Sequence, residues 1–147
     1  MQVHSVDRVI LATWDLDETI SLFEELLGVS FASLMEPTTT TEDGPQEVAN
    51  VISETGLEIV TPRGEDNEVS RFLEENGPGL YALSLRVEDL ETAKSELADE
   101  GITPVGEYAT GNFVEVFYHP ENFGGAMTIL AEYYTEHPAV VAAESGG

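Results

Sequence analysis

Residues 6–28 of the chain, VDRVILATWDLDETISLFEELLG, have the pattern of a β-strand that runs into an α-helix. The apolar run at 9–12 is typical of a buried strand. Asp15 is a favourable helix N-cap, and Glu18 follows three residues later, as in a capping box. Apolar residues then recur every three or four positions until Gly28, a common helix stop.

A weaker copy of this unit begins about half the chain later. Residues 80–102, LYALSLRVEDLETAKSELADEGI, again contain an apolar strand, an N-cap at Asp89, helical spacing and a glycine stop at Gly101. Further strand-like apolar segments follow both units. A supersecondary unit that occurs twice predicts two similar modules that share one core.

We therefore predict an α+β fold, in which two βαβββ modules form one cupped, eight-stranded mixed sheet with helices outside. The first module spans 3–62, a linker helix 67–76 and the second module 80–134, so that 1–134 form one domain. Residues 135–147 are small and polar and are predicted as a flexible tail. The predicted strands are 3–13, 29–34, 47–53, 57–61, 80–87, 103–108, 112–118 and 126–133, and the other predicted helices are 16–27 and 90–100.

The chain has 147 residues, with 29 acidic side chains against five basic ones and a formal net charge of −24. Phosphate binding needs clustered Lys and Arg, so nucleic acid and anionic membrane surfaces are excluded as partners. We expect the solvated acidic surface of a protein that works at high salt, where screening weakens self-repulsion. The sequence has no cysteine, signal-peptide pattern or membrane-spanning run, so we expect a cytoplasmic protein without disulfides or thiolate sites.

Two charged residues interrupt otherwise apolar strands. Arg8 does so in the first strand, and Glu58 does so between Leu57 and Ile59. Strand side chains alternate between faces, and we expect both charges on the concave face of the sheet, a natural small-molecule site. An arginine and a glutamate on neighbouring strands of one face are in position to pair.

Several short motifs follow one another along the chain: EIVTP at 58–62, FL at 72–73, GLYAL at 79–83, FYHP at 117–120 and GGA at 124–126. Together with the first strand and helix, they resemble the vicinal oxygen chelate superfamily. This family includes glyoxalase I, extradiol dioxygenases, bleomycin-resistance proteins and methylmalonyl-CoA epimerase, and the motifs look most like the epimerase branch. The resemblance covers about residues 6–134, and it implies the two-module fold and a homodimer.

In metal-dependent members of this family, four inward strand positions hold the ion, usually as His, Glu or Gln, His and Glu. The resemblance puts Arg8, Glu58, Ala82 and Ile129 at these positions. Only the glutamate among them is a metal ligand. We therefore expect no metal and no other cofactor. A divalent ion is expected only if other residues supply the missing ligands and so rebuild the site.

Residues 36–47 are polar, contain two prolines and four consecutive threonines, and are predicted as a long loop with room for one short strand. Long loops often cover sites. The acidic residues Glu42, Asp43 and Glu47 of this loop are the candidates to rebuild a metal site.

We hypothesise a small-molecule-binding protein of the glyoxalase/bleomycin-resistance type, in which the Arg8–Glu58 pair replaces the metal. A guanidinium can grip a carboxylate through two parallel hydrogen bonds, so a small carboxylate is the expected ligand. Trp14, Tyr81 and Tyr118 are candidates to line the pocket against a planar ligand.

Two alternatives stay open from the sequence. One is an isomerase or lyase that resembles methylmalonyl-CoA epimerase or glyoxalase, with Glu58 as the catalytic proton-transfer base. The other is a dimeric scaffold without a ligand. A metal enzyme is stabilised by a divalent ion, a binding protein by a small ligand, and a scaffold by neither.

Overall fold

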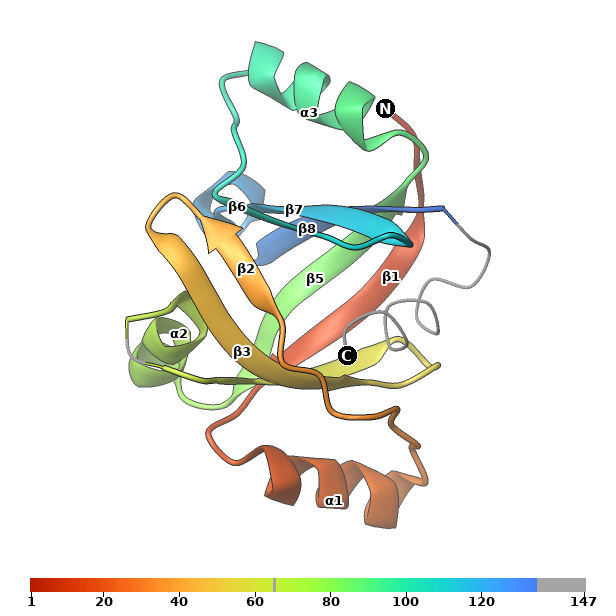
Figure 1. The fold of residues 1–147 in the computed structure, drawn as a ribbon, viewed down its shortest axis with the longest axis vertical. Coiled ribbons are helices and arrows are strands. Elements are labelled where there is room, and N and C mark those ends of the chain that lie inside the picture. Colours follow the sequence, from red (N-terminus) through yellow and green to blue (C-terminus); the bar gives the residue numbers. More distant parts are fainter. Residues whose placement is uncertain (65, 135–147) are drawn as a thin grey trace.

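A computed structural model describes residues 1–64 and 66–134 of the chain (Figure 1). Its α-helices are α1 (Leu16–Leu27), α2 (Glu68–Asn76) and α3 (Leu90–Asp99). Its strands are β1 (Val3–Ala12), β2 (Thr38–Thr41), β3 (Gly44–Ile52), β4 (Leu57–Pro62), β5 (Gly79–Val87), β6 (Gly106–Ala109), β7 (Phe113–Tyr118) and β8 (Met127–Tyr133), and a 3₁₀ helix, η1 (Pro120–Phe123), precedes β8. The tail predicted at 135–147 lies outside the described residues. Within the described ranges, no helix has both the length and the apolar composition needed to cross a membrane.

The eight strands form one closed barrel in the order β1-β4-β3-β2-β6-β7-β8-β5. The parallel pairs β1–β4 and β5–β8 occupy equivalent positions in the two halves, and β1 pairs antiparallel with β5 to join them. This confirms the predicted α+β fold with an eight-stranded mixed sheet and helices outside (Figure 1). The sheet also closes on the other side, where β2 pairs with β6 through Thr40–Glu107 and Thr41–Gly106.

The second strand differs from the prediction. Residues 29–34 form no strand and contribute only an isolated bridge from Phe31 to Ser53. The strand β2 lies instead at Thr38–Thr41, within the stretch predicted as a loop, and a tight turn ending at Gly44 with φ of +104° connects it to β3. The reason is that β-branched threonines suit a strand, and β3 pairs with β4 and β2, which leaves no edge for 29–34.

Helices α1 and α3 begin at the predicted N-caps, and α1 ends at its predicted glycine, whereas α3 ends at Asp99 with Glu100 rather than Gly101 as its C-cap. The Asp15 carboxylate accepts the Glu18 N–H at 3.0 Å, and Gly28 ends α1 in the left-handed region with φ of 68°. At the start of α3, the Asp89 carboxylate accepts the Thr92 N–H at 3.1 Å. These local contacts fix both helices relative to the strands that precede them.

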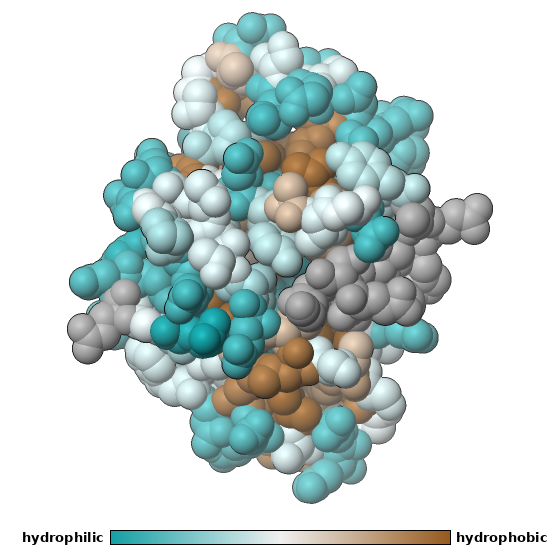
Figure 2. Space-filling view, viewed as in Figure 1, coloured by the Kyte–Doolittle hydropathy of each residue, from teal (hydrophilic) through white to brown (hydrophobic). Residues whose placement is uncertain are grey.

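Apolar side chains line much of the barrel interior and fill the space beneath α3. The first cluster runs from the barrel interior to α2 and comprises Ile10, Ala12, Val60, Val69, Leu73, Ala82, Met127 and Ile129. The second cluster lies beneath α3 and comprises Val87, Leu90, Ala93, Val116, Tyr118 and Leu130. No residue of α1 is buried, and Figure 2 shows apolar groups gathered near this helix and in a second area below α3.

Candidate functional site

The barrel contains a cavity of about 120 Å³. Much of its wall is apolar and is formed by Ile10, Met35, Val48, Val60, Phe117, Met127 and Ile129. Five buried polar residues also line it: Arg8, Gln46, Asn50, Glu58 and Glu115. Three acidic side chains that are exposed or half-buried, Glu42, Asp43 and Glu68, line the cavity where it reaches the surface. The site is thus an apolar pocket with a set of buried charges.

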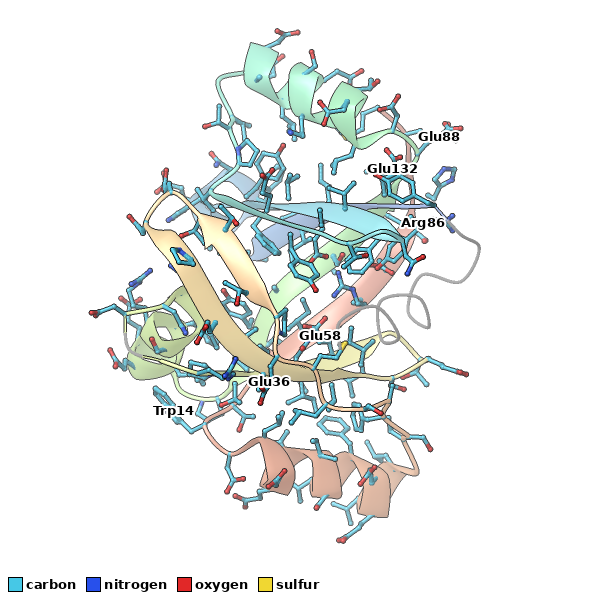
Figure 3. All side chains as sticks on the ribbon, viewed as in Figure 1. Trp14, Glu36, Glu58, Arg86, Glu88 and Glu132 are labelled. Carbon is cyan, nitrogen blue, oxygen red and sulfur yellow. The ribbon has the colours of Figure 1, made fainter. Side chains whose placement is uncertain are left out.

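Arg8 is the centre of these buried charges and is only 3% exposed. Its Nη1 donates to Glu58 Oε1 at 2.5 Å, so the two residues singled out in the sequence are in direct contact (Figure 3 labels Glu58). Its Nη2 donates to Glu115 Oε2 at 2.5 Å and to Ser84 Oγ at 3.3 Å. Its Nε donates to Asp7 Oδ2 at 3.0 Å. All three guanidinium nitrogens are therefore engaged by neighbouring side chains.

A β-bulge explains why the neighbouring residues Asp7 and Arg8 are both buried. Along β5, Val6 pairs with Leu85 and Arg8 pairs with Ser84, so Asp7 is an extra residue in β1. In a regular strand, two successive side chains point to opposite faces, but a bulge re-aims one of them. The insertion brings a second charge of β1 into the same cluster.

The cluster contains more carboxylates than cations. Asp7 Oδ2 accepts a hydrogen bond from Tyr133 OH at 2.6 Å as well as the one from Arg8. Burial raises the pKa of Glu115 above its usual value, while the neighbouring guanidinium opposes this change. Burial acts to lower the pKa of Arg8, but the charges of Glu115 and Glu58 outweigh it and raise that pKa, so the guanidinium stays protonated.

Both carboxylate oxygens of Glu58 have partners. Oε1 accepts from Arg8, and Oε2 accepts from Asn50 Nδ2 at 3.0 Å. Because a carboxylate only accepts hydrogen bonds, the amide nitrogen of Asn50 must face it. The Asn50 Oδ1 is then buried without a hydrogen-bond partner among the residues that the structure describes.

The aromatic residues predicted for the pocket lie in three different environments. Tyr81 lines the cavity and packs edge-to-face on Phe72, with 5.1 Å between ring centroids. Tyr118 does not line it, contrary to the prediction, because alternation along β7 directs Glu115 into the cavity and Tyr118 into the cluster beneath α3. Trp14 is 52% exposed and lies outside the barrel (Figure 3).

The remaining positions that the resemblance gave to metal ligands are apolar. Ala82 and Ile129 are buried in the barrel cluster. Across residues 1–64 and 66–134, no group of three or more His, Cys, Asp or Glu side chains is arranged to hold a metal ion. Of the loop candidates, Glu42 and Asp43 line the cavity and Glu47 does not.

Sequence reasoning did not identify Asp7, Asn50 or Glu115. Glu115 interrupts the apolar run FVEVFY just as Glu58 interrupts its own strand, so the same signal was present. The other two had no such signal: Asp7 is next to a residue already assigned to the inner face, and Asn50 has a common polar side chain.

Comparison with known proteins relates the chain to one superfamily. Residues 7–117 match the model of the glyoxalase/bleomycin resistance protein/dioxygenase superfamily. The mitochondrial methylmalonyl-CoA epimerase of Dictyostelium discoideum is 27% identical over 134 residues, which cover 88% of this chain and 79% of that protein.

Solved structures show the same fold. The methylmalonyl-CoA epimerase of Mycobacterium tuberculosis superimposes with a TM-score of 0.73 at 26% identity, and the match covers 90% of each chain. A variant of the Streptomyces coelicolor epimerase in complex with 2-nitronate-propionyl-CoA has a TM-score of 0.71 at 22% identity, covering 91% of this chain and 100% of that one.

Proposed function

The chain belongs to the glyoxalase/bleomycin resistance protein/dioxygenase superfamily, as its motifs predicted, and on that premise we propose that it binds a small molecule in the barrel cavity without a metal ion. In this proposal the Arg8–Glu58 ion pair replaces the metal. The observation that carries it is the 2.5 Å contact between Arg8 Nη1 and Glu58 Oε1 on the wall of a largely apolar cavity.

The residues at the expected metal site do not fit a divalent ion. Arg8 supplies a positive charge there, and it uses the Glu58 carboxylate that an ion needs as a ligand. Ala82 and Ile129 carry hydrocarbon side chains, which cannot ligate a metal. Glu115 offers no replacement, because it also binds the guanidinium. The proposed function therefore involves no metal.

A metal titration and a ligand screen test this proposal together. We expect no stoichiometric metal in elemental analysis of protein refolded at high salt, and no change in melting temperature with Mn²⁺, Co²⁺, Ni²⁺ or Zn²⁺. In a thermal-shift screen of small fragments, we expect hits that disappear in the cavity-filling variant Ile129→Phe. A bound metal, or a screen whose hits are indifferent to this variant, contradicts the proposal.

The relatives favour one specific alternative, an epimerase with Glu58 as the proton-transfer base. The contacts argue against it, because both oxygens of Glu58 are engaged by Arg8 and Asn50, and a base needs an oxygen that can reach the substrate proton. Incubation with methylmalonyl-CoA in D₂O tests it directly. We expect no deuterium at the substrate α-carbon, whereas incorporation that Glu58→Gln abolishes supports the enzyme.

We also propose that the chain forms a homodimer, as the family resemblance implies. Support comes from large apolar side chains exposed on and beside α1: Leu22, Leu26, Leu27 and Leu34. An exposed apolar patch is typical of a protein interface. Sedimentation analysis at high salt is expected to give a dimer, and the double variant Leu26→Gln, Leu27→Gln is expected to give monomers. An unchanged dimer in this variant rules out α1 as the interface.

A further inference from the structure

The buried charges on the cavity wall, together with Asp7 beyond it, are not balanced. Glu58, Glu115 and Asp7 all bind the guanidinium of Arg8, so three carboxylates face one cation. Each of these side chains is at most 9% exposed. With Glu115 protonated, one excess negative charge remains, and with it ionised there are two. Because unbalanced charge is costly where water is excluded, the site favours a positively charged ligand.

Asn50 points independently to a ligand that donates hydrogen bonds. This residue lines the cavity and is 5% exposed, and its amide nitrogen is committed to Glu58. Its Oδ1 is a buried acceptor that no described residue satisfies. A buried acceptor without a partner is destabilising, so a donor brought by a ligand gains the bond that the protein itself does not make.

The rest of the cavity limits the size and polarity of the ligand. Its volume of about 120 Å³ is close to that of an engineered apolar cavity, about 150 Å³, that binds benzene. Its wall includes the hydrocarbon side chains of Ile10, Val60 and Ile129. A compact body of about one ring fits this space, and an extended or strongly polar one does not.

Within the proposed function, on which this step rests, we infer that the ligand is a small organic cation: a primary ammonium group on a compact apolar body. The ammonium donates to Asn50 Oδ1 and to the Glu115 carboxylate, of which only Oε2 binds Arg8, and the charge of Glu58 adds to the attraction. The apolar body lies against the hydrocarbon wall. Acidic side chains at the surface end, including Glu42 and Asp43, raise the local concentration of such a cation.

This inference reverses the carboxylate ligand expected from the sequence. That expectation needed a guanidinium with free donors. Four of the five N–H groups of Arg8 already donate to Asp7, Glu58, Glu115 and Ser84, which leaves no pair of them for two parallel hydrogen bonds to a carboxylate. An incoming carboxylate also adds a further negative charge to an already negative site.

Three ligands of one shape and different charge test the inference by isothermal titration calorimetry: benzylamine, benzyl alcohol and benzoate. We expect benzylamine to bind at least tenfold more tightly than benzyl alcohol, and benzoate not to bind. The titrations are done in 1 M KCl, because a chain of charge −24 attracts cations to its surface at low salt. Ile129→Phe, which fills the cavity, is expected to abolish benzylamine binding.

The matched variants Asn50→Leu and Asn122→Leu separate the site from the surface. Asn50→Leu keeps the approximate volume but removes the Oδ1 acceptor, together with the amide donor to Glu58. We expect at least a tenfold loss of benzylamine affinity, with benzyl alcohol affected less than threefold. Asn122 is exposed on η1, and its replacement is expected to change neither affinity. Circular dichroism and the retained binding of benzyl alcohol show that Asn50→Leu is folded.

Failure of the inference is distinguishable from failure of the proposed function. If benzyl alcohol or benzoate binds as tightly as benzylamine and Ile129→Phe blocks it, the ligand class is overturned and the binding function stands. If benzylamine binds equally well to the Asn50→Leu or Ile129→Phe variant, it occupies the surface and the inference is overturned. If none of the three binds, the inference is likewise overturned, and the fragment screen decides the binding function by itself.

Discussion

Arg8 and Glu115 are 107 residues apart in the chain, yet their side chains form a 2.5 Å ion pair inside the barrel. Arg8 belongs to the first module and Glu115 to the second. With the Arg8–Glu58 pair, this contact makes one guanidinium bridge β1, β4 and β7. The stability of the barrel should therefore depend on Arg8 more than on any surface arginine.

Arg8→Met is expected to destabilise the protein severely, because it leaves buried carboxylates without a cation. Removing one partner of a buried ion pair typically costs about 3–5 kcal/mol. Urea unfolding at pH 7 and high salt measures the change in the free energy of unfolding. Arg63→Met is the control, since Arg63 is partly exposed and lies 3.8 Å from Glu36 at the surface, where ion pairs contribute little. Equal effects of the two variants contradict the role assigned to Arg8.

Glu115 is expected to make stability depend on pH in a defined direction. Burial raises its pKa in the folded state above the ordinary value of 4.5. This contribution to stability is fully present below the unfolded pKa and is lost as the pH rises through the folded pKa, because the unfolded carboxyl ionises more readily. A carboxyl group that binds its proton tenfold more tightly in the folded state lowers the free energy of unfolding by about 1.4 kcal/mol as the pH rises across this range.

The measurement is the free energy of unfolding from pH 4 to pH 8 at high salt, for the wild type and for Glu115→Gln. The wild type is expected to lose stability relative to the variant as the pH rises above about 4.5. Glu107→Gln, at an exposed position on β6, serves as the control for removing a negative charge. A difference between wild type and Glu115→Gln that is constant across the range contradicts the raised pKa.

Salt is expected to stabilise the protein, since 29 acidic side chains repel one another at low ionic strength. The screening length falls from about 10 Å at 0.1 M to about 3 Å at 1 M salt, so the melting temperature should rise with KCl. Glu24→Gln with Glu25→Gln removes two exposed charges from the C-terminal half of α1, where negative charge also opposes the helix dipole. This double variant is expected to melt higher at low salt and to respond less to KCl.

Any side chain at position 106 is expected to disturb the pairing between β2 and β6. A Cβ there meets Thr40 O at 3.0 Å and a ring carbon of Phe117 at 3.1 Å. Gly106→Ala should therefore destabilise by about 1–3 kcal/mol, the usual range for overpacking. Gly111→Ala is the matched control, because a Cβ at that position has no neighbour within 4 Å. Urea unfolding compares the free energies of unfolding of the two variants. Equal values show that β2 and β6 can move apart without loss of stability.

The fold could be predicted because its signals are local. The caps at Asp15 and Asp89 and the repeated strand–helix pattern depend on neighbours in sequence, and both helices begin where those signals occur. The strand at 38–41 was obscured because its hydrogen bonds come from β3 and β6, and nothing in four consecutive threonines encodes these partners.

The site could be predicted only in part, for reasons of strand geometry. Arg8 and Glu58 were identifiable because each breaks an apolar run, and the interior of a barrel accepts such a residue only with a partner. The burial of Asp7 could not be predicted, because it depends on a bulge that interrupts the strict alternation of side chains along β1. Tyr118 was assigned to the wrong face because its alternation with Glu115 along β7 was not used.

Closure of the barrel also bears on how copies of the chain can meet. Each of the eight described strands has a neighbouring strand on both sides, so the sheet has no edge strand, and in β1 the residues before Val9 pair with β5 alone. An unpaired edge is the usual template for strand addition and for fibrillar aggregation. Copies of this protein are therefore expected to associate through side chains rather than through a continuous intermolecular sheet, even when salt has screened the negative charge.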